Sequence, residues 1–179
     1  MSADNKDSTL REQIKTMWLM LVITALSLFI DQFTKMLVRK ATSTNETIVL
    51  IKGWLHLIHS GNSGMAFGML PGWNHILTFV SIFAIVFILM YYKQFMPTRW
   101  MQVSLGLVLG GALGNLVDRI LYGYVTDFIR IRWWFSRYRW WPSFNIADAC
   151  VCVGAAMLII AMFNRSMSVD GSDQVEPDE

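Results

Sequence analysis

The chain has few of the cysteine and histidine residues that stabilise small secreted or metal-binding domains. Its 179 residues include two cysteines, three histidines and four prolines. Cys150 and Cys152 lie two positions apart in an apolar run, and on one helix such side chains point to different sides. We therefore expect no disulfide between them and interpret both as small packing residues, not as a redox or metal motif.

Metal and serine-hydrolase sites are disfavoured by residue spacing. His56 and His59 fall in a β-rich run, where residues three apart point to opposite faces of the strand. Ser63 lies near His59, but no nucleophile-elbow pattern surrounds it. We therefore predict neither a metal ion nor another cofactor.

Charge is also scarce, at 16% of residues, and no basic block with interleaved aromatic residues suggests nucleic acid as a partner. The polar segment 1–15 leads into an apolar run with no small-x-small cleavage site, so it lacks the form of a secretory signal peptide. The first hydrophobic segment should therefore remain in the protein as a membrane helix.

Hydrophobic residues are abundant, at 54% of the chain, and the mean hydropathy is +0.41, which indicates an integral membrane protein. We predict an all-α integral membrane protein with four transmembrane helices, a small extracytoplasmic β element and an interfacial amphipathic segment. The four apolar segments are long enough to span a bilayer. They cover about residues 17–38, 76–92, 100–121 and 146–163, flanked by a frayed polar segment at 1–15 and a disordered acidic tail at 164–179.

Two segments between the helices have other compositions. Within the predicted β element, about residues 44–67, the β-rich runs Thr47–Ile51 and Trp54–His59 flank Lys52-Gly53, which predicts a hairpin. The segment 130–142 is rich in tryptophan and arginine, which suits the headgroup layer. We interpret it as an interfacial anchor, with a substrate-gating lid as the alternative.

The first helix carries a polar stripe that must face protein or water instead of lipid. Its members fall within a 100° arc and are Thr24, Ser27, Asp31, Thr34 and Lys35. Asp31 and Lys35 are four residues apart and can neutralise each other, so we interpret them as a structural ion pair.

The third and fourth helices each have a face of small and polar residues. On the third they are Gly110, Gly111, Gly114, Asn115, Asp118, Arg119 and Tyr122; on the fourth they are Asn145, Asp148, Ala149, Cys152, Ala155 and Ala156. Small residues allow close helix approach, so we expect these two faces to pack together. Asp118 should support the local structure by pairing with Arg119 or with another cation nearby.

Two carboxylates should meet at one membrane boundary. Asp127 follows the end of the third helix, and Asp148 lies in the first turn of the fourth. A close carboxylate pair shares a proton, and this arrangement can hydrolyse a peptide bond without a metal ion. Such pairs also build proton-coupled transporters. However, the second span offers only Thr78 and Ser81 to a polar path, and a non-catalytic scaffold would leave the pair unexplained.

Five ordered motifs resemble those of the bacterial lipoprotein signal peptidases, or signal peptidase II. The resemblance covers about residues 31–149. It is carried by Asp31 with Lys35; Asn62, Gly64, Ala66 and Phe67; Gly114, Asn115, Asp118 and Arg119; Val125, Asp127 and Phe128; and Phe144, Asn145, Ala147 and Asp148. Met65 departs from the family, which more often has alanine there.

The resemblance implies a specific activity and site. Asp127 and Asp148 would be the catalytic pair, and the residues that shape or support the site would be Asn62, Asn115, Asp118, Arg119 and Asn145. The substrates would be prolipoproteins cut just before a diacylglyceryl-modified cysteine at the outer face of the cytoplasmic membrane. Globomycin-like cyclic peptides would inhibit the enzyme, which we expect to be a monomer in contact with membrane lipid.

Orientation is the one point on which two arguments disagree. With four spans, the side that holds both termini has six basic residues, and the other side has nine. The positive-inside rule would then put the termini outside, whereas the resemblance puts them in the cytoplasm. We expect cytoplasmic termini, because Arg119 and the arginines of segment 130–142 can be explained by a partner at Asp118 and by anionic headgroups.

Overall fold

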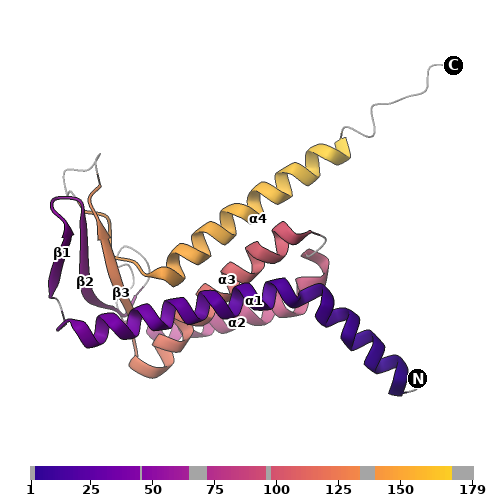
Figure 1. Ribbon diagram of the computed structural model, residues 1–179, viewed down its shortest axis with the longest axis horizontal. Coiled ribbons are helices and arrows are strands. Elements are labelled where there is room, and N and C mark those ends of the chain that lie inside the picture. The colour runs from indigo at the N-terminus through magenta and orange to yellow at the C-terminus, as the bar shows by residue number, and fades with distance from the viewer. Residues whose placement is uncertain (1–2, 45, 65–71, 96–97, 134–139, 171–179) are drawn as a thin grey trace.

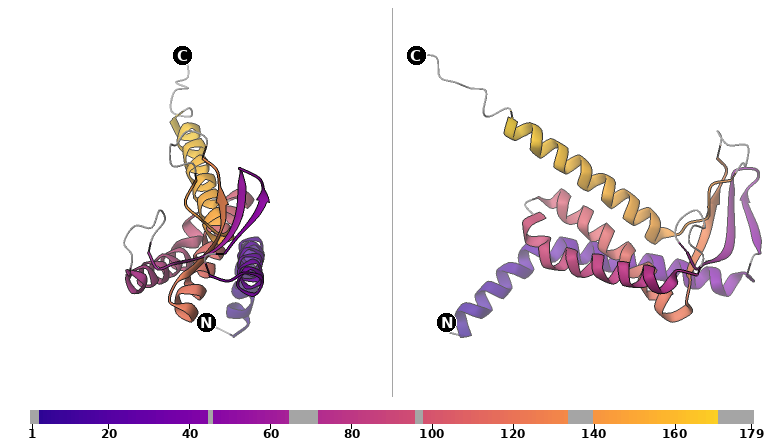
Figure 2. Two further views of the ribbon diagram at one scale, coloured as in Figure 1. Left: turned by 90° about the vertical axis from the view of Figure 1, so that its left-hand side faces the viewer. Right: turned by 180° about the vertical axis from the view of Figure 1, so that it is seen from behind.

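Four helices form a bundle, and a small sheet covers one of its ends (Figure 1). The computed structural model describes residues 3–44, 46–64, 72–95, 98–133 and 140–170. Its elements are α1 (Ala3–Ala41), β1 (Thr47–Ile51), β2 (Leu55–Asn62), α2 (Asn74–Phe95), α3 (Arg99–Tyr122), β3 (Val125–Ile131) and α4 (Ile146–Asp170). The N-terminus and the C-terminal end of α4 lie at the end of the bundle away from the sheet, also when seen from behind (Figure 2).

The four predicted spans are confirmed. The helical segments long and apolar enough to cross a membrane are Met17–Ala41, Asn74–Tyr92, Arg99–Tyr122 and Ile146–Phe163. Helix α3 is the central one: it packs against the other three helices, and half of its most apolar window is buried, against 6% for α2. The polar groups that α3 carries are therefore shielded from lipid.

Helical structure extends beyond the predicted spans at both ends of the chain. Helix α1 already begins at Ala3, and α4 continues to Asp170, so the expected fraying of residues 3–15 and disorder of residues 164–170 are wrong. Five of the six residues 10–15 are Leu, Arg, Glu, Gln or Lys, which have high helix propensity and allow the helix to continue outside the apolar layer. Residues 171–179 of the predicted tail lie outside the described residues.

Glycines of α3 set the distances between the helices. A Cβ at Gly110 would lie 2.6 Å from the Cβ of Ser27 on α1, and a Cβ at Gly111 would overlap the carbonyl oxygen of Ala147 on α4. The predicted close approach of α3 and α4 is therefore present, and Asn145 and Asp148 of the predicted face contact Asn115 of α3. The small residues of that face are not the ones at the contact. Helix α4 meets α3 through Ala147, Val151 and Gly154, and the predicted small residues Ala149 and Cys152 line a cavity instead.

The sheet has the strand order β1-β2-β3, with both pairings antiparallel. The predicted hairpin is confirmed, with Thr47 opposite Ile58 and Ile51 opposite Leu55. Strand β3 was not predicted, although it lies only two residues after Gly123, whose φ of 75° ends α3. It pairs with β2 from Asn62 opposite Val125 to Leu55 opposite Ile131.

The described ends of the predicted interfacial segment also belong to this sheet. Residues 130 and 131 complete β3, and the chain returns with bridges between Arg132 and Trp140 and between Ile129 and Phe144. Residues 134–139 of the segment lie outside the described residues. The return brings the chain directly from the sheet to the first residue of α4.

Candidate active site

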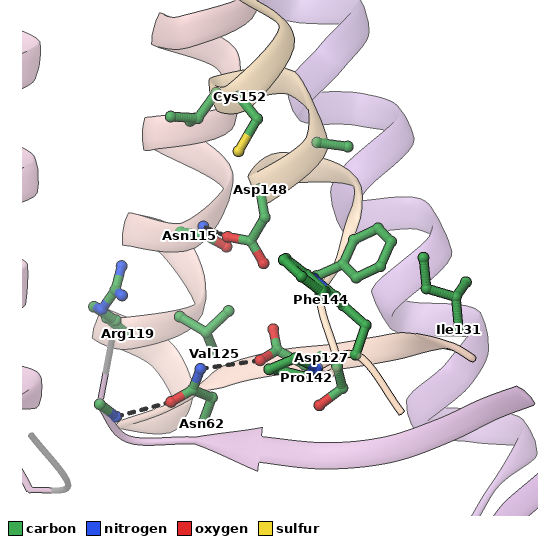
Figure 3. Close-up of a pocket in the computed structure, with 15 residues that line it drawn as sticks. Asn62, Asn115, Arg119, Val125, Asp127, Ile131, Pro142, Phe144, Asp148 and Cys152 are labelled. Carbon is green, nitrogen blue, oxygen red and sulfur yellow. Dashed lines mark hydrogen bonds between the residues drawn. The ribbon is translucent and has the colours of Figure 1, made fainter. Parts of the chain in front are cut away.

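A cavity of about 430 Å³ opens where the ends of α3 and α4 meet β2 and β3 (Figure 3). Its polar lining residues are Asn62, Asn115, Arg119, Asp127, Ser143 and Asp148. Its apolar lining includes Val125, Ile131, Phe144 and Val151. Asp127 and Asp148, which sequence analysis placed at one depth, therefore line the same cavity, although 20 residues lie between them.

Asp148 is fixed by the start of α4. Asn145 precedes the helix, and its side-chain oxygen accepts the Asp148 N–H at 2.9 Å, while its own N–H donates to Asp148 Oδ2 at 3.2 Å. This reciprocal pair is the arrangement of a capping box. The first turn of a helix also favours negative charge. Asp148 is half-buried and in contact with the cavity, so its carboxylate is available to a ligand.

Asp127 is held on β3 and is 2% exposed. Asn62 donates to its Oδ2 at 3.0 Å (Figure 3). Asn145 donates to its Oδ1 at 2.8 Å. Burial, and after it the negative charge of Asp148, raise the pKa of this carboxyl from 3.8 to about 7. The two amide hydrogen bonds and the positive charge of Lys35 oppose this rise. Asp127 is therefore protonated below about pH 7 and loses its proton as the pH rises through that value.

Three asparagine side chains point their NH₂ groups at the two carboxyls. The amide oxygen of each one accepts a hydrogen bond from another group, which fixes its orientation. The Oδ1 of Asn62 accepts the Gly64 N–H at 3.0 Å, and that of Asn145 accepts the Asp148 N–H. The Oδ1 of Asn115 accepts from Lys35 Nζ at 3.0 Å, while its Nδ2 donates to Asp148 Oδ1 at 2.8 Å. Because each amide oxygen already has a donor, the hydrogen-bond network specifies the orientation of each amide.

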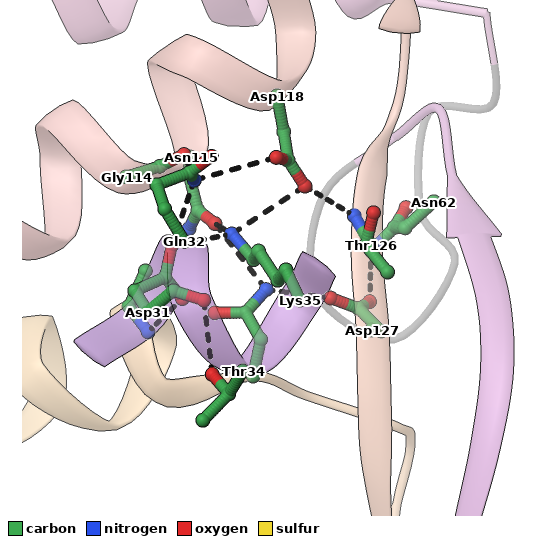
Figure 4. Close-up of polar contacts among 12 residues, drawn as sticks. Asp31, Gln32, Thr34, Lys35, Asn62, Gly114, Asn115, Asp118, Thr126 and Asp127 are labelled. Atoms are coloured by element: carbon green, nitrogen blue, oxygen red, sulfur yellow. Dashed lines mark hydrogen bonds and ion pairs between the residues drawn. The ribbon is translucent and has the colours of Figure 1, made fainter. Parts of the chain in front are cut away.

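A buried ionic cluster lies behind these asparagines (Figure 4). Lys35 Nζ lies 2.8 Å from Asp31 Oδ2 and 3.5 Å from Asp118 Oδ2, and all three side chains are 0% exposed. Arg39 Nη1 lies 3.3 Å from Asp118 Oδ1. The predicted Asp31–Lys35 pair is therefore present, and the cations of Asp118 come from α1. Of the two partners expected for Asp118, Arg119 or another cation nearby, the structure shows the second, because neighbouring helix positions such as 118 and 119 point about 100° apart.

The cluster also links the helices to the strand that carries Asp127. Asp118 Oδ2 accepts the Thr126 N–H at 2.8 Å, and Arg39 donates to Thr126 Oγ1 at 2.8 Å. Asp31 Oδ1 accepts the Ala147 N–H at 2.9 Å, so the same cluster also reaches the first turn of α4. Sequence reasoning missed Arg39 and Thr126. Arg39 follows Lys35 by four residues on the same stripe of α1, which was an available signal.

Arg119 lines the cavity and is half-buried (Figure 3). Its Nε has no hydrogen-bond partner among the described residues. A cation with a free donor beside two carboxyls can bind an acceptor of an incoming ligand. The predicted site residues Ala66 and Phe67 and the variable Met65 lie outside the described residues.

The two histidines of β2 have other contacts. The His56 ring stacks on Trp140 with 4.1 Å between centroids, and His59 Nδ1 lies 3.2 Å from the carbonyl oxygen of Thr42. Within the part of the chain that the structure describes, no group of three His, Cys, Asp or Glu side chains could hold a metal ion.

Comparison with known proteins identifies the family. The sequence pattern of the family described as signal peptidase (SPase) II matches residues 23–164, which is most of the chain. The chain belongs to the signal peptidase II family. It is 38% identical over 144 residues to the lipoprotein signal peptidase of Halothermothrix orenii, covering 80% of this chain and 94% of that one. It is 36% identical over 159 residues to that of Pseudomonas putida, covering 86% and 90%.

Solved structures agree with this membership. Two structures described as bacterial membrane enzymes superpose with TM-scores of 0.75 and 0.71 at 28% and 29% sequence identity. The first covers 89% of this chain and 93% of its own chain, and the second covers 80% and 91%. As a member of the signal peptidase II family with four membrane-spanning helices, the protein is a multi-pass bacterial membrane peptidase.

Proposed function

We propose that the protein is an aspartic endopeptidase that removes signal peptides from diacylglyceryl-modified prolipoproteins, cutting just before the lipidated cysteine. The observation that carries the proposal is that Asn145 hydrogen-bonds both carboxyls of the cavity, Asp127 through its side chain and Asp148 through its backbone. One residue thereby holds two carboxyls together beside a cavity large enough for a ligand. The names of the lipoprotein signal peptidases to which the chain is similar supply the substrate class.

The environments of the two carboxyls favour different roles. Buried Asp127, whose pKa is raised to about 7, is the proton donor, and half-buried Asp148 in the first helical turn is the base. Asp148 takes a proton from water as the water oxygen attacks the scissile carbonyl carbon, and Asp127 gives its proton to the carbonyl oxygen. Asp148 then protonates the leaving nitrogen as the C–N bond breaks, and Asp127 recovers its proton as the carbonyl re-forms.

The position of the site suits a substrate that is anchored in a membrane. The cavity lies at the end of the bundle where α3 ends and α4 begins, and apolar side chains make up much of its wall. A lipidated cysteine at the membrane surface would present its preceding peptide bond at that depth. We place this end at the outer face of the cytoplasmic membrane and both termini in the cytoplasm. Arg119 would donate a hydrogen bond to a carbonyl oxygen of the substrate.

Purified protein in detergent or liposomes should cleave a prolipoprotein whose cysteine carries diacylglycerol, and mass spectrometry should find the lipidated cysteine at the new N-terminus. The matched control is the same precursor without lipid, which should remain intact. Cleavage should persist in EDTA, because the proposed chemistry uses only carboxyls, and should be blocked by globomycin. Equal cleavage of both precursors, or loss of activity in EDTA with recovery on adding zinc, would contradict the proposal.

A further inference from the structure

Lys35 connects the structural ion cluster to the proposed catalytic residues. Its ammonium group is fully buried and has three N–H donors, which match three acceptors. Two acceptors are the carboxylates of Asp31 and Asp118, at 2.8 Å and 3.5 Å. The third is Asn115 Oδ1, at 3.0 Å (Figure 4). Asn115 is also the residue whose Nδ2 donates to Asp148 Oδ1.

The lysine charge decides between two orientations of the Asn115 amide. Rotating the amide by 180° exchanges its oxygen and nitrogen with almost no change in shape. In the rotated state the NH₂ group would face the Lys35 ammonium, and the amide oxygen would face the Asp148 carboxylate. Both contacts would be repulsive, and Asn145 Nδ2, 3.2 Å from Asn115 Oδ1, would lose one of its two acceptors and keep only Asp127 Oδ1. The buried cation therefore selects the orientation in which Asn115 donates to Asp148.

We propose that Lys35 is a positioning residue for the peptidase reaction: it orients Asn115, and Asn115 in turn orients the Asp148 carboxylate toward the cavity. This inference rests on the proposed function for its kinetic test. It differs from a purely structural ion pair in its consequences, since an ion pair that only joins helices would affect the amount of folded protein and not the turnover of each folded molecule.

Removing Lys35 alone would leave the buried Asp31 without a cation, and Asp118 with Arg39 alone, and could unfold the protein. The charge-balanced variant Asp31→Asn/Lys35→Met avoids this, because an asparagine oxygen at position 31 can still accept the Ala147 N–H. We expect kcat per folded molecule to fall about tenfold to a hundredfold, as for a misplaced reacting group, with KM within about twofold of wild type. Lys40→Met, which removes an exposed lysine from the same helix, is the matched control and should leave kcat and KM unchanged.

A double-mutant cycle separates positioning from stability. If Lys35 acts through Asn115, the charge-balanced substitution should lower kcat in the wild-type background and have little further effect in an Asn115→Ala background. Additive losses, or wild-type kcat in the charge-balanced variant, would overturn the inference. Melting temperatures of all variants are measured in parallel, so that kcat is referred to folded protein.

The inference also has a test that does not depend on cleavage. A crystal structure of Asp31→Asn/Lys35→Met should show the Asn115 side chain rotated or displaced from Asp148. An unchanged Asn115–Asp148 contact would overturn the positioning role, whatever the substrate is. Failure of the wild-type protein to cut the lipidated precursor would count against the proposed function alone.

Discussion

Asn145 and Asp148 cap the first turn of α4 for each other, with hydrogen bonds of 2.9 Å and 3.2 Å between side chain and backbone in both directions. The same Asn145 side chain reaches across to Asp127 on β3 at 2.8 Å. The position of Asp148 relative to Asp127 is therefore set by how α4 begins. Asn145, which caps the N-terminus of α4, therefore also sets the geometry of the proposed acid–base pair.

Replacing either carboxyl by the amide of the same shape should abolish cleavage. We expect Asp127→Asn and Asp148→Asn each to lower kcat by about 10²–10⁴-fold, because each removes one partner of a proton transfer. Folding should be retained, since both side chains keep their volume. The measurement is single-turnover cleavage of the lipidated precursor, with the exposed Glu46→Gln as control. Wild-type turnover by either variant would remove that residue from the catalytic pair.

Activity should decline as the pH rises through about 7, where Asp127 loses the proton that it donates. Because the negative charge of Asp148 contributes to raising the pKa of Asp127, Asp148→Asn should lower that pKa. The infrared carboxyl band that disappears in Asp127→Asn reports this titration directly. An unshifted band in Asp148→Asn would show that the two carboxyls are not coupled.

The same pKa shift predicts how stability depends on pH. The Asp127 carboxyl binds its proton more strongly in the folded protein than in the unfolded chain, where the ordinary value of 3.8 applies. The free energy of unfolding should therefore fall as the pH rises from about 4 to about 7. Thermal denaturation in detergent across this pH range measures the effect. In Asp127→Asn, stability should depend less steeply on pH.

Asp118 should matter to stability at least as much as to turnover. Asp118→Ala would leave Lys35, Arg39 and the Thr126 N–H without their shared acceptor, at a cost of about 3–5 kcal/mol for a broken buried ion pair. Melting temperature and kcat per folded molecule distinguish the two effects, and Glu46→Ala provides an exposed acidic control. A fully stable but inactive Asp118→Ala would place Asp118 among the catalytic residues.

The proposed orientation can be checked by labelling intact cells with an impermeant thiol reagent, after replacing Cys150 and Cys152. A cysteine at Lys52, in the turn between β1 and β2, should react. One at Arg99, at the opposite end of the bundle, should react only after the membrane is opened. The reverse pattern would invert the topology and separate the site from the proposed substrate.

The spans, the hairpin and the buried stripe of α1 could be predicted because each depends on local hydropathy or periodicity. Of the five residues in the predicted 100° arc, Thr24, Ser27, Asp31 and Lys35 are buried and Thr34 is half-buried. Strand β3 was missed because its partner lies far away in the sequence, with Asn62 opposite Val125. Its β-branched residues Val125, Thr126, Ile129 and Ile131 were the available signal.

Side-chain pairing was the least predictable part of the site. Asp118 is next to Arg119 in the sequence, yet its partners Lys35 and Arg39 come from a different helix. Likewise, small residues on α4 were expected at a helix contact, whereas Ala149 and Cys152 leave space for the cavity. A small residue permits either close packing or an open space, and only the position of the neighbouring helix decides between them.

The ion pair between Asp31 and Lys35 has a consequence for how the protein is made. Helix α1 is synthesised and enters the membrane before α3 exists, so Asp118 cannot yet help to neutralise Lys35 and Arg39. A partner four residues away in the same helix lets α1 insert with Asp31 and Lys35 already neutralised by each other. Arg39 keeps an unpaired positive charge until α3 brings Asp118 beside it. The charges of the helices therefore favour an order in which α1 inserts first and α3 then packs against it.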